Sequence, residues 1–244
     1  LPDPRLRAPV VTWGVFDGVH RGHRRVIGSA VDWARAAGAT SCILTFDRHP
    51  EEVLRGKTVP LLCPTAERLR RIGELGVDAC VIVPFTQEFS RTTAEEFVRG
   101  IVAGRLGARG IVLGHDSRFG RDRAGDLEML AGLGRAVGLE VRRSEPELHA
   151  GRPVSSSLIR EAIFAGRLDE AGFLLGRTPS VFGTAVRGSR RGSSLGFPTA
   201  NLELRHGVRP PPGVYAVDVP MDGGLRRGVS NLGTRPTFET EGPE

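Results

Sequence analysis

The chain has 244 residues, enough for one large or two modest domains at about 150 residues per domain. Its hydrophobic content of 39% and charged content of 25% are ordinary for a soluble globular protein, and no run approaches the roughly 20 apolar residues of a membrane span. The net charge is +6, but the arginines are spread along the chain and aromatics make up only 6%, so we expect neither a nucleic acid nor a membrane as partner.

Cysteine usage and the first residues of the chain both indicate an intracellular protein. Cys42, Cys63 and Cys80 are scattered and form no CxxC pair. The opening stretch, LPDPRLRAPV, has no apolar signal core. We therefore expect a reduced, cytoplasmic setting.

Short apolar strands alternate with helical patterns over most of the chain. The predicted strands are 9–16, 42–46, 79–85 and 109–114, and the predicted helices are 23–38, 65–76, 93–107 and 126–138. Thr93 and Glu96 form a capping-box pattern at the start of the third helix. This alternation predicts an α/β fold with a parallel, doubly wound sheet, in which ligands bind beyond the carboxyl ends of the strands.

After Gly176 the helical pattern stops. The alternating segments at 180–188, 199–204, 213–219 and 226–233 are split by glycine and proline, which predicts an antiparallel β-sandwich or barrel. The link GRTPS marks the boundary, giving predicted domains at 1–178 and 179–244.

The stretch GVFDGVHRGH, residues 14–23, lies where the first strand passes into the first helix. Three interpretations of His20 and His23 stay open on these residues alone: metal ligands with Asp17, an ordinary turn, or a phosphate site. A metal needs a further ligand that the sequence does not supply nearby. The phosphate interpretation accounts for more, because Gly14 and Gly18 let backbone approach a ligand and a helix N-terminus favours an anion.

The same stretch resembles the HxGH signature of the nucleotidyltransferases, and its FDGVHxGH form resembles bacterial bifunctional riboflavin kinase/FMN adenylyltransferases, or FAD synthetases. Further stretches match that family in order through both predicted domains: LTFDRHP (44–50), LGHDSRFG with RAGD (113–126), VSSSLIREAI (154–163), GFPTANL (196–202), GVYA (213–216) and NLGTRPTF (231–238). Ser117 departs from the pattern, which usually has an aromatic residue there.

The resemblance implies that a Rossmann-like first domain transfers AMP from ATP to FMN, giving FAD and pyrophosphate. It also implies roles for individual residues. The implied catalytic residues, which stabilise phosphate charge, are His20, His23 and Arg160. The implied ATP-binding residues are Gly14, Phe16, Asp17, Gly22, Ser155 and Ser156. The implied flavin-proximal residues are Phe46, His49, Asp116 and Phe119.

The resemblance further implies that the second domain is an incomplete β-barrel of riboflavin kinase, whose substrates are riboflavin and ATP. Gly192, Thr199 and Asn201 would hold ATP there, with Thr199 and Asn201 reaching Mg²⁺. Family members continue past NLGTRPTF to a glutamate base, so we expect a C-terminally truncated chain without kinase activity. The alternatives are a nucleotidyltransferase of another substrate class, a non-catalytic flavin- or nucleotide-binding protein, and an RNA-binding regulator.

Overall fold

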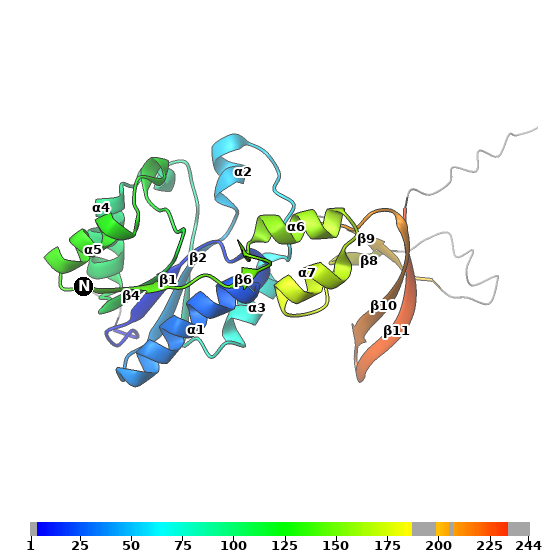
Figure 1. The fold of residues 1–244 in the computed structure, drawn as a ribbon, viewed down its shortest axis with the longest axis horizontal. Coiled ribbons are helices and arrows are strands. Elements are labelled where there is room, and N and C mark those ends of the chain that lie inside the picture. The colour runs from blue at the N-terminus through cyan, green and yellow to red at the C-terminus, as the bar shows by residue number, and fades with distance from the viewer. Residues whose placement is uncertain (1–3, 187–198, 205–206, 234–244) are drawn as a thin grey trace, which may run out of the picture.

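The computed structural model describes residues 4–186, 199–204 and 207–233. Its first region is built on a five-stranded sheet in the order β3-β2-β1-β4-β5, with every pair parallel (Figure 1). The strands are β1 (Val10–Trp13), β2 (Ser41–Phe46), β3 (Ala79–Val83), β4 (Gly110–Gly114) and β5 (Glu140–Ser144). The predicted doubly wound parallel sheet is therefore confirmed.

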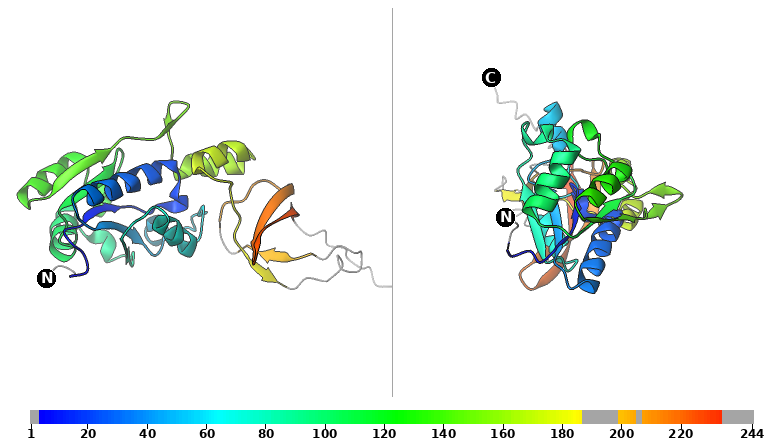
Figure 2. Two further views of the ribbon diagram at one scale, coloured as in Figure 1. Left: turned by 90° about the horizontal axis from the view of Figure 1, so that it is seen from below. Right: turned by 90° about the vertical axis from the view of Figure 1, so that its left-hand side faces the viewer.

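Helices cover both faces of this sheet (Figure 2). The main helices are α1 (Arg21–Ala36), α2 (Pro50–Arg55), α3 (Thr65–Gly73), α4 (Ala94–Glu96), α5 (Leu127–Ala136), α6 (Ser156–Phe164) and α7 (Leu168–Leu175). Short 3₁₀ turns lie at η1 (Asp17–Val19), η2 (Phe89–Arg91) and η4 (Arg121–Arg123), and a two-residue hairpin joins β6 (Leu148–His149) to β7 (Arg152–Pro153).

Alternation along the strands decides which helix packs on which face. Val11 faces the cluster that contains Phe97 and Leu130, whereas its neighbour Val10 packs with Trp33 of α1. Successive side chains of a strand point to opposite faces, so a strand buried on both faces reads as a continuous apolar run. This is why VVTW and SCILT are buried throughout.

Two local features differ from the expected pattern. The predicted helix 93–107 begins with the expected capping box at Thr93, but from Phe97 to Arg105 it is a π-helix, η3. Nothing in the surrounding packing explains this widening. Strand β5 has the sequence EVRRS, whose charged residues hid it from a search for apolar runs. It is an edge strand, so its arginines can reach solvent.

The second region contains two antiparallel ladders, as the sequence predicts. Strand β8 (Thr184–Val186) pairs with β9 (Asn201–Glu203), and β10 (Gly213–Met221) pairs with β11 (Gly224–Leu232). Within the described residues these ladders do not join into one sheet. Apolar side chains on them are exposed: Val186, Leu202, Val214, Val219, Met221, Leu225 and Val229.

One segment of the second region returns to the first. Val208 is 6% exposed and packs in the cluster formed by α6, α7 and Leu62. Its backbone N–H donates a hydrogen bond to the Leu61 carbonyl at 3.1 Å. The loop that carries Leu61 and Leu62 is thus held from both regions of the chain.

Candidate active site at the end of β1

The turn after β1 has an unusual backbone. Phe16, Gly18 and Val19 all have positive φ, at 52°, 79° and 42° respectively. Such values are rare for a β-branched residue such as Val19, and strain of this kind is found mostly at functional sites. A Cβ on Gly18 would lie 2.7 Å from the Leu62 side chain, so this position requires glycine. The turn is closely packed on loop 60–62.

Gly14 and Gly22, two glycines predicted to bind ATP, lie on either side of this turn. Gly14 N–H donates to the Leu44 carbonyl at 3.1 Å, and a Cβ there would lie 3.3 Å from the Phe16 ring. A Cβ on Gly22 would lie 2.9 Å from the Val154 carbonyl oxygen. The absence of side chains at both positions lets the turn and the helix start pack close to their neighbours.

His20 and His23 stack on one another at the N-terminus of α1. Their ring centroids are 3.5 Å apart with an interplanar angle of 21°. His20 is the N-cap residue, and its Nδ1 accepts the His23 backbone N–H at 3.3 Å. Because Nδ1 is the acceptor, a neutral His20 carries its proton on Nε2. His23 Nδ1 is buried and has no partner among the described residues.

Both imidazoles are held neutral. Burial, followed by the charges of Arg177 and Arg160, lowers the pKa of His20 to about 3. Burial and the neighbouring His20 hold the pKa of His23 well below its ordinary value. At neutral pH the pair therefore offers hydrogen-bonding nitrogens without a charge, at a helix end where free N–H groups favour an anion.

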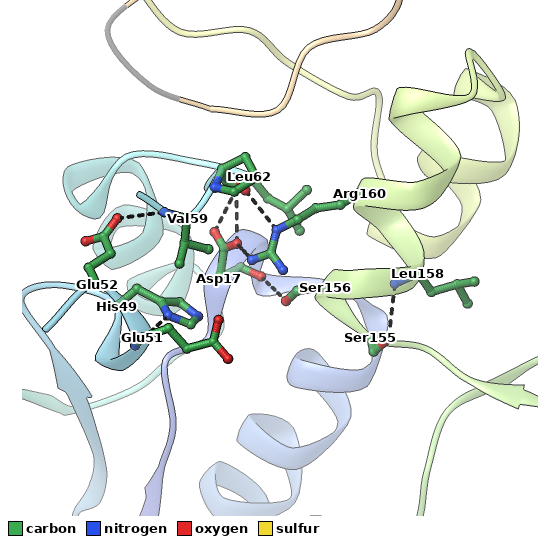
Figure 3. Close-up of polar contacts among 11 residues, drawn as sticks. Asp17, His49, Glu51, Glu52, Val59, Leu62, Ser155, Ser156, Leu158 and Arg160 are labelled. Carbon is green, nitrogen blue, oxygen red and sulfur yellow. Dashed lines mark hydrogen bonds and ion pairs between the residues drawn. The ribbon is translucent and has the colours of Figure 1, made fainter. Parts of the chain in front are cut away.

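Asp17 connects this turn to two distant parts of the chain (Figure 3). Its carboxylate accepts the Leu62 backbone N–H at 2.9 and 3.1 Å and pairs with Arg160 Nη2 at 2.6 Å. Its carbonyl accepts the Ser156 hydroxyl at 3.0 Å. Asp17 and Arg160 side chains are 3% and 15% exposed, so the pair is largely shielded from water.

The stretch VSSSLIREAI contains the N-cap and most of helix α6. Ser155 caps the helix by accepting the Leu158 N–H at 3.2 Å. Arg160 Nε donates to the Pro60 carbonyl at 2.8 Å, and its Nη1 takes part in neither this bond nor the Asp17 pair. The structure therefore brings Asp17, Ser156 and Arg160 together beside His20.

Phe46 is the last residue of β2, and His49 follows it as the N-cap of α2. His49 Nδ1 caps α2 by accepting the Glu51 N–H at 3.2 Å. Burial and the charge of Arg160 lower the pKa of His49, so the two side chains are electrostatic neighbours. Phe46 packs edge-on against Phe85, with ring centroids 5.1 Å apart.

Asp116 and Phe119, which follow β4, lie in different surroundings. The Asp116 side chain is 78% exposed. Phe119 is buried and packs against Trp13 at 5.3 Å, within the core that covers one face of the sheet. Any effect of Phe119 on a ligand would therefore pass through the packing of that core.

The predicted kinase residues are only partly described. Thr199 is exposed, Asn201 begins β9 and is partly buried, and Gly192 lies outside the described residues. In the described part of the chain, no group of three or more His, Cys, Asp and Glu side chains gathers to hold a metal ion, either here or at His20 and His23. No helix of that part is long and apolar enough to cross a membrane.

Sequence reasoning missed loop 60–62 and Arg68. The loop acts through backbone groups, the Leu62 N–H and the Pro60 carbonyl, which leave no mark in a motif. Arg68 of α3 is 2% exposed, donates to the Phe46 carbonyl and lowers the pKa of His23 after burial and His20. One sequence feature could have indicated Arg68: it lies on the same side of the predicted helix as the buried Ile72.

Comparison with known proteins agrees with this arrangement. The family description "FAD synthetase" matches residues 3–158, and "Riboflavin kinase" matches residues 175–243. The curated bifunctional riboflavin kinase/FMN adenylyltransferase of Pseudomonas fluorescens is 36% identical over 239 residues, covering 98% of this chain and 77% of the relative. The enzyme of the same description from Bacillus subtilis is 34% identical over 239 residues, covering 96% of this chain and 75% of the relative.

A solved structure from Streptococcus pneumoniae, described as a macrolide-efflux protein, has a TM-score of 0.85 and 32% identity, covering 98% of this chain and 77% of that one. That coverage means that the likeness includes both regions of the fold. The matches confirm the resemblance found in the sequence. The chain therefore belongs to the bifunctional riboflavin kinase/FMN adenylyltransferase family.

Proposed function

We propose that the first region of the chain transfers AMP from ATP to FMN, giving FAD and pyrophosphate. The observation that carries this proposal is the stacked, neutral pair His20 and His23 at the N-terminus of α1, joined through Asp17 to Ser156 and Arg160. The site combines a helix end, hydrogen-bond donors and a guanidinium, which are the groups that stabilise charge on phosphates.

An FMN phosphate oxygen attacks the α-phosphorus of ATP, and the bond from that phosphorus to the bridging oxygen of the β-phosphate breaks. The nucleophile is already ionised at neutral pH, so the protein supplies no base. Its work is alignment and stabilisation of the charge that builds on the phosphate oxygens. His20 does this by donating from Nε2, because its Nδ1 already accepts the His23 N–H.

Arg160 and Ser156 act at the same phosphates in a different way. Most of their described bonds go to Asp17 and Pro60, so they first hold the turn in place. Arg160 Nη1 is the remaining donor, and we propose it as the phosphate contact. Gly14, Phe16 and Gly22 shape the ATP site, while Phe46, His49, Asp116 and Phe119 belong to the flavin side.

Mg²⁺ is proposed as the cofactor. Since the described residues hold no ready-made cluster of carboxylates or imidazoles, the ion would be bound mainly through ATP oxygens and water, as Mg²⁺ usually is with nucleotides. When bound, it supplies positive charge to the departing pyrophosphate. Thr199 and Asn201 have oxygen atoms of the type that Mg²⁺ prefers and are the proposed contacts in the kinase region.

The test is to mix the protein with FMN, ATP and MgCl₂ and to look for FAD by chromatography. Formation of FAD is the expected result, and His20→Ala or His23→Ala should lower the rate about 100-fold or more while the melting temperature shows a folded protein. Tight FMN binding without FAD would favour a binding protein, and full rates in both alanine variants would remove the histidines from the mechanism.

We further propose that the two functional regions divide near residue 178 and that a polypeptide of these 244 residues does not phosphorylate riboflavin. The apolar side chains exposed on β10 and β11, such as Val214 and Val229, support an incomplete core in the described part of the second region. Incubation with riboflavin and ATP-Mg²⁺ should give no FMN. Appreciable formation of FMN would overturn this proposal and would leave the proposal on FAD formation unaffected.

A further inference from the structure

Arg177 follows Gly176, the C-cap of α7, and Gly176 lies at the end of α1 that carries the histidine pair. Gly176 ends α7 with φ 71°, and a Cβ there would lie 3.3 Å from both Arg21 Cγ and Arg24 Nη1 in the first turns of α1. Figure 1 shows α7 beside this end of α1. The GRTPS link therefore touches the helix start that His20 caps.

The Arg177 guanidinium is partly buried and lacks an acidic partner. Over the described residues it forms no ion pair, and its one hydrogen bond runs from Nη1 to the Leu175 carbonyl at 3.4 Å. Burial and the nearby Arg71 and Arg24 lower the pKa of Arg177 to about 10, against the opposing effects of Cys63 and Glu67. A partly desolvated cation among other cations is costly unless an anion joins them.

The acidic groups nearby are already engaged. Glu67 Oε1 forms an ion pair with Arg71 Nη2 at 2.5 Å, and Asp17 Oδ2 forms one with Arg160 Nη2 at 2.6 Å. Arg177 is left as the charge that, after burial, most lowers the pKa of His20. Arg177 and Arg160 therefore both place positive charge near His20.

We propose that Arg177 binds the phosphate groups of the nucleotide alongside His20. This inference rests on the proposed function, since it takes ATP to be the ligand of the site. The planar guanidinium matches two phosphate oxygens at once, which a lone ammonium does not. Arg177 thereby becomes a substrate-binding residue that belongs to the segment connecting the two regions.

The test compares Arg177→Gln with the unmodified 244-residue chain. The KM for ATP should rise about 10- to 100-fold, the loss expected for a hydrogen bond to a charged group, while the KM for FMN stays unchanged. Arg177→Lys should recover part of the loss, since it keeps the charge. Inhibition by inorganic tripolyphosphate should weaken, whereas inhibition by adenosine should not.

Arg167→Gln is the matched control. Arg167 lies at the other end of α7 and pairs with Glu170 at the surface, so its removal should leave the KM for ATP unchanged. An equal tripolyphosphate affinity in the Arg177→Gln variant and the unmodified chain, measured by calorimetry, would overturn the inference. Calorimetry needs no turnover, so absence of FAD formation would count against the proposed function alone.

A second measurement covers the case in which Arg177→Gln does not fold. The unmodified chain is treated with phenylglyoxal, which reacts with accessible arginine side chains, and the modified peptides are read by mass spectrometry. Tripolyphosphate should shield Arg177, and adenosine should not. Equal modification of Arg177 with and without tripolyphosphate would contradict the proposal.

Discussion

Folding buries the His20 ring, which is surrounded by water in the unfolded chain. Its pKa falls from 6.5 to about 3 on folding, so between these pH values the unfolded chain binds a proton that the folded chain does not. Stability conferred by the neutral ring is therefore complete above pH 6.5 and is lost as the pH falls. The loss approaches about 1.4 kcal/mol per pH unit for one such group.

We predict that the melting temperature drops between pH 7 and pH 5 and that His20→Asn makes this drop shallower. Asparagine can still cap α1, so the variant removes the titrating ring while keeping the cap. Thermal denaturation followed by circular dichroism over this pH range measures both slopes. Parallel curves for the two proteins would show that His20 does not titrate on unfolding.

The Asp17 carboxylate accepts a backbone N–H and pairs with a guanidinium that is shielded from water. Asp17→Asn should lower stability by about 3–5 kcal/mol, since it leaves Arg160 buried without its counter-charge. Asp32→Asn is the control, because the Asp32 side chain is 77% exposed and its ion pair with Arg35 lies in water. Similar urea midpoints for both variants would contradict the argument.

The residues of the site differ in how well the sequence alone could predict their positions. The motif around His20 and His23 was evident, because its glycines and its place between strand and helix have local reasons. The Asp17–Arg160 pair joins residues 143 positions apart, and no local pattern indicates which carboxylate an arginine will meet. Phe119, which we predict on the flavin side, is buried against Trp13, and an aromatic residue after a strand suits either a core or a binding site.

At the scale of elements, packing between α1 and β4 depends on one glycine. A Cβ on Gly110 would lie 2.2 Å from the Trp33 ring, which is buried in a cluster with Val10 and Val112. Gly110→Ala should therefore destabilise the protein by about 1–3 kcal/mol, as overpacking of a core does. Gly28→Ala, in α1 with open space at its Cβ, should instead raise stability by about 0.5–1 kcal/mol.

Thermal melts check this pair of variants, and a shift of about 2–4 °C per kcal/mol is expected for a chain of this size. Equal shifts in the same direction would mean that the Trp33 contact does not limit the approach of helix and strand. The comparison is clean because both changes add the same single carbon.

The strands of the parallel sheet that have an apolar pattern were predicted, and the one without such a pattern was missed. Strands β1, β2 and β4 are apolar and buried, and burial is what an apolar run reports. Strand β3 has the same apolar pattern, although it lies at a sheet edge and is only partly buried. Strand β5 is charged and pairs through its backbone, whose hydrogen bonds do not depend on side-chain type. The change from helix to antiparallel ladders after Gly176 was predicted from glycine and proline spacing and is confirmed.

At the scale of the whole molecule, Val208 links the second region to the loop that supports Asp17. Val208→Asp should place a carboxylate in the cluster of α6 and α7 and lower stability by at least about 2 kcal/mol. We expect slower FAD formation as well, because loop 60–62 also supplies the Leu62 N–H and the Pro60 carbonyl.

Val229→Asp is the matched control, since Val229 is 76% exposed and an aspartate there meets water. Melting temperature and FAD formation should both stay close to those of the unmodified protein. If Val208→Asp behaves in the same way, the returning segment has no part in holding the site.

The return of Val208 also affects how the protein can be divided for experiments. A fragment ending at residue 178 would contain all the predicted adenylyltransferase residues, yet it would leave a hole where Val208 fills the cluster beside Leu62. Such a fragment should express poorly, and a peptide spanning residues 207–213 added in trans should raise its melting temperature. A stable fragment of the first region would therefore need residues from both sides of position 178, because Val208 packs against that region.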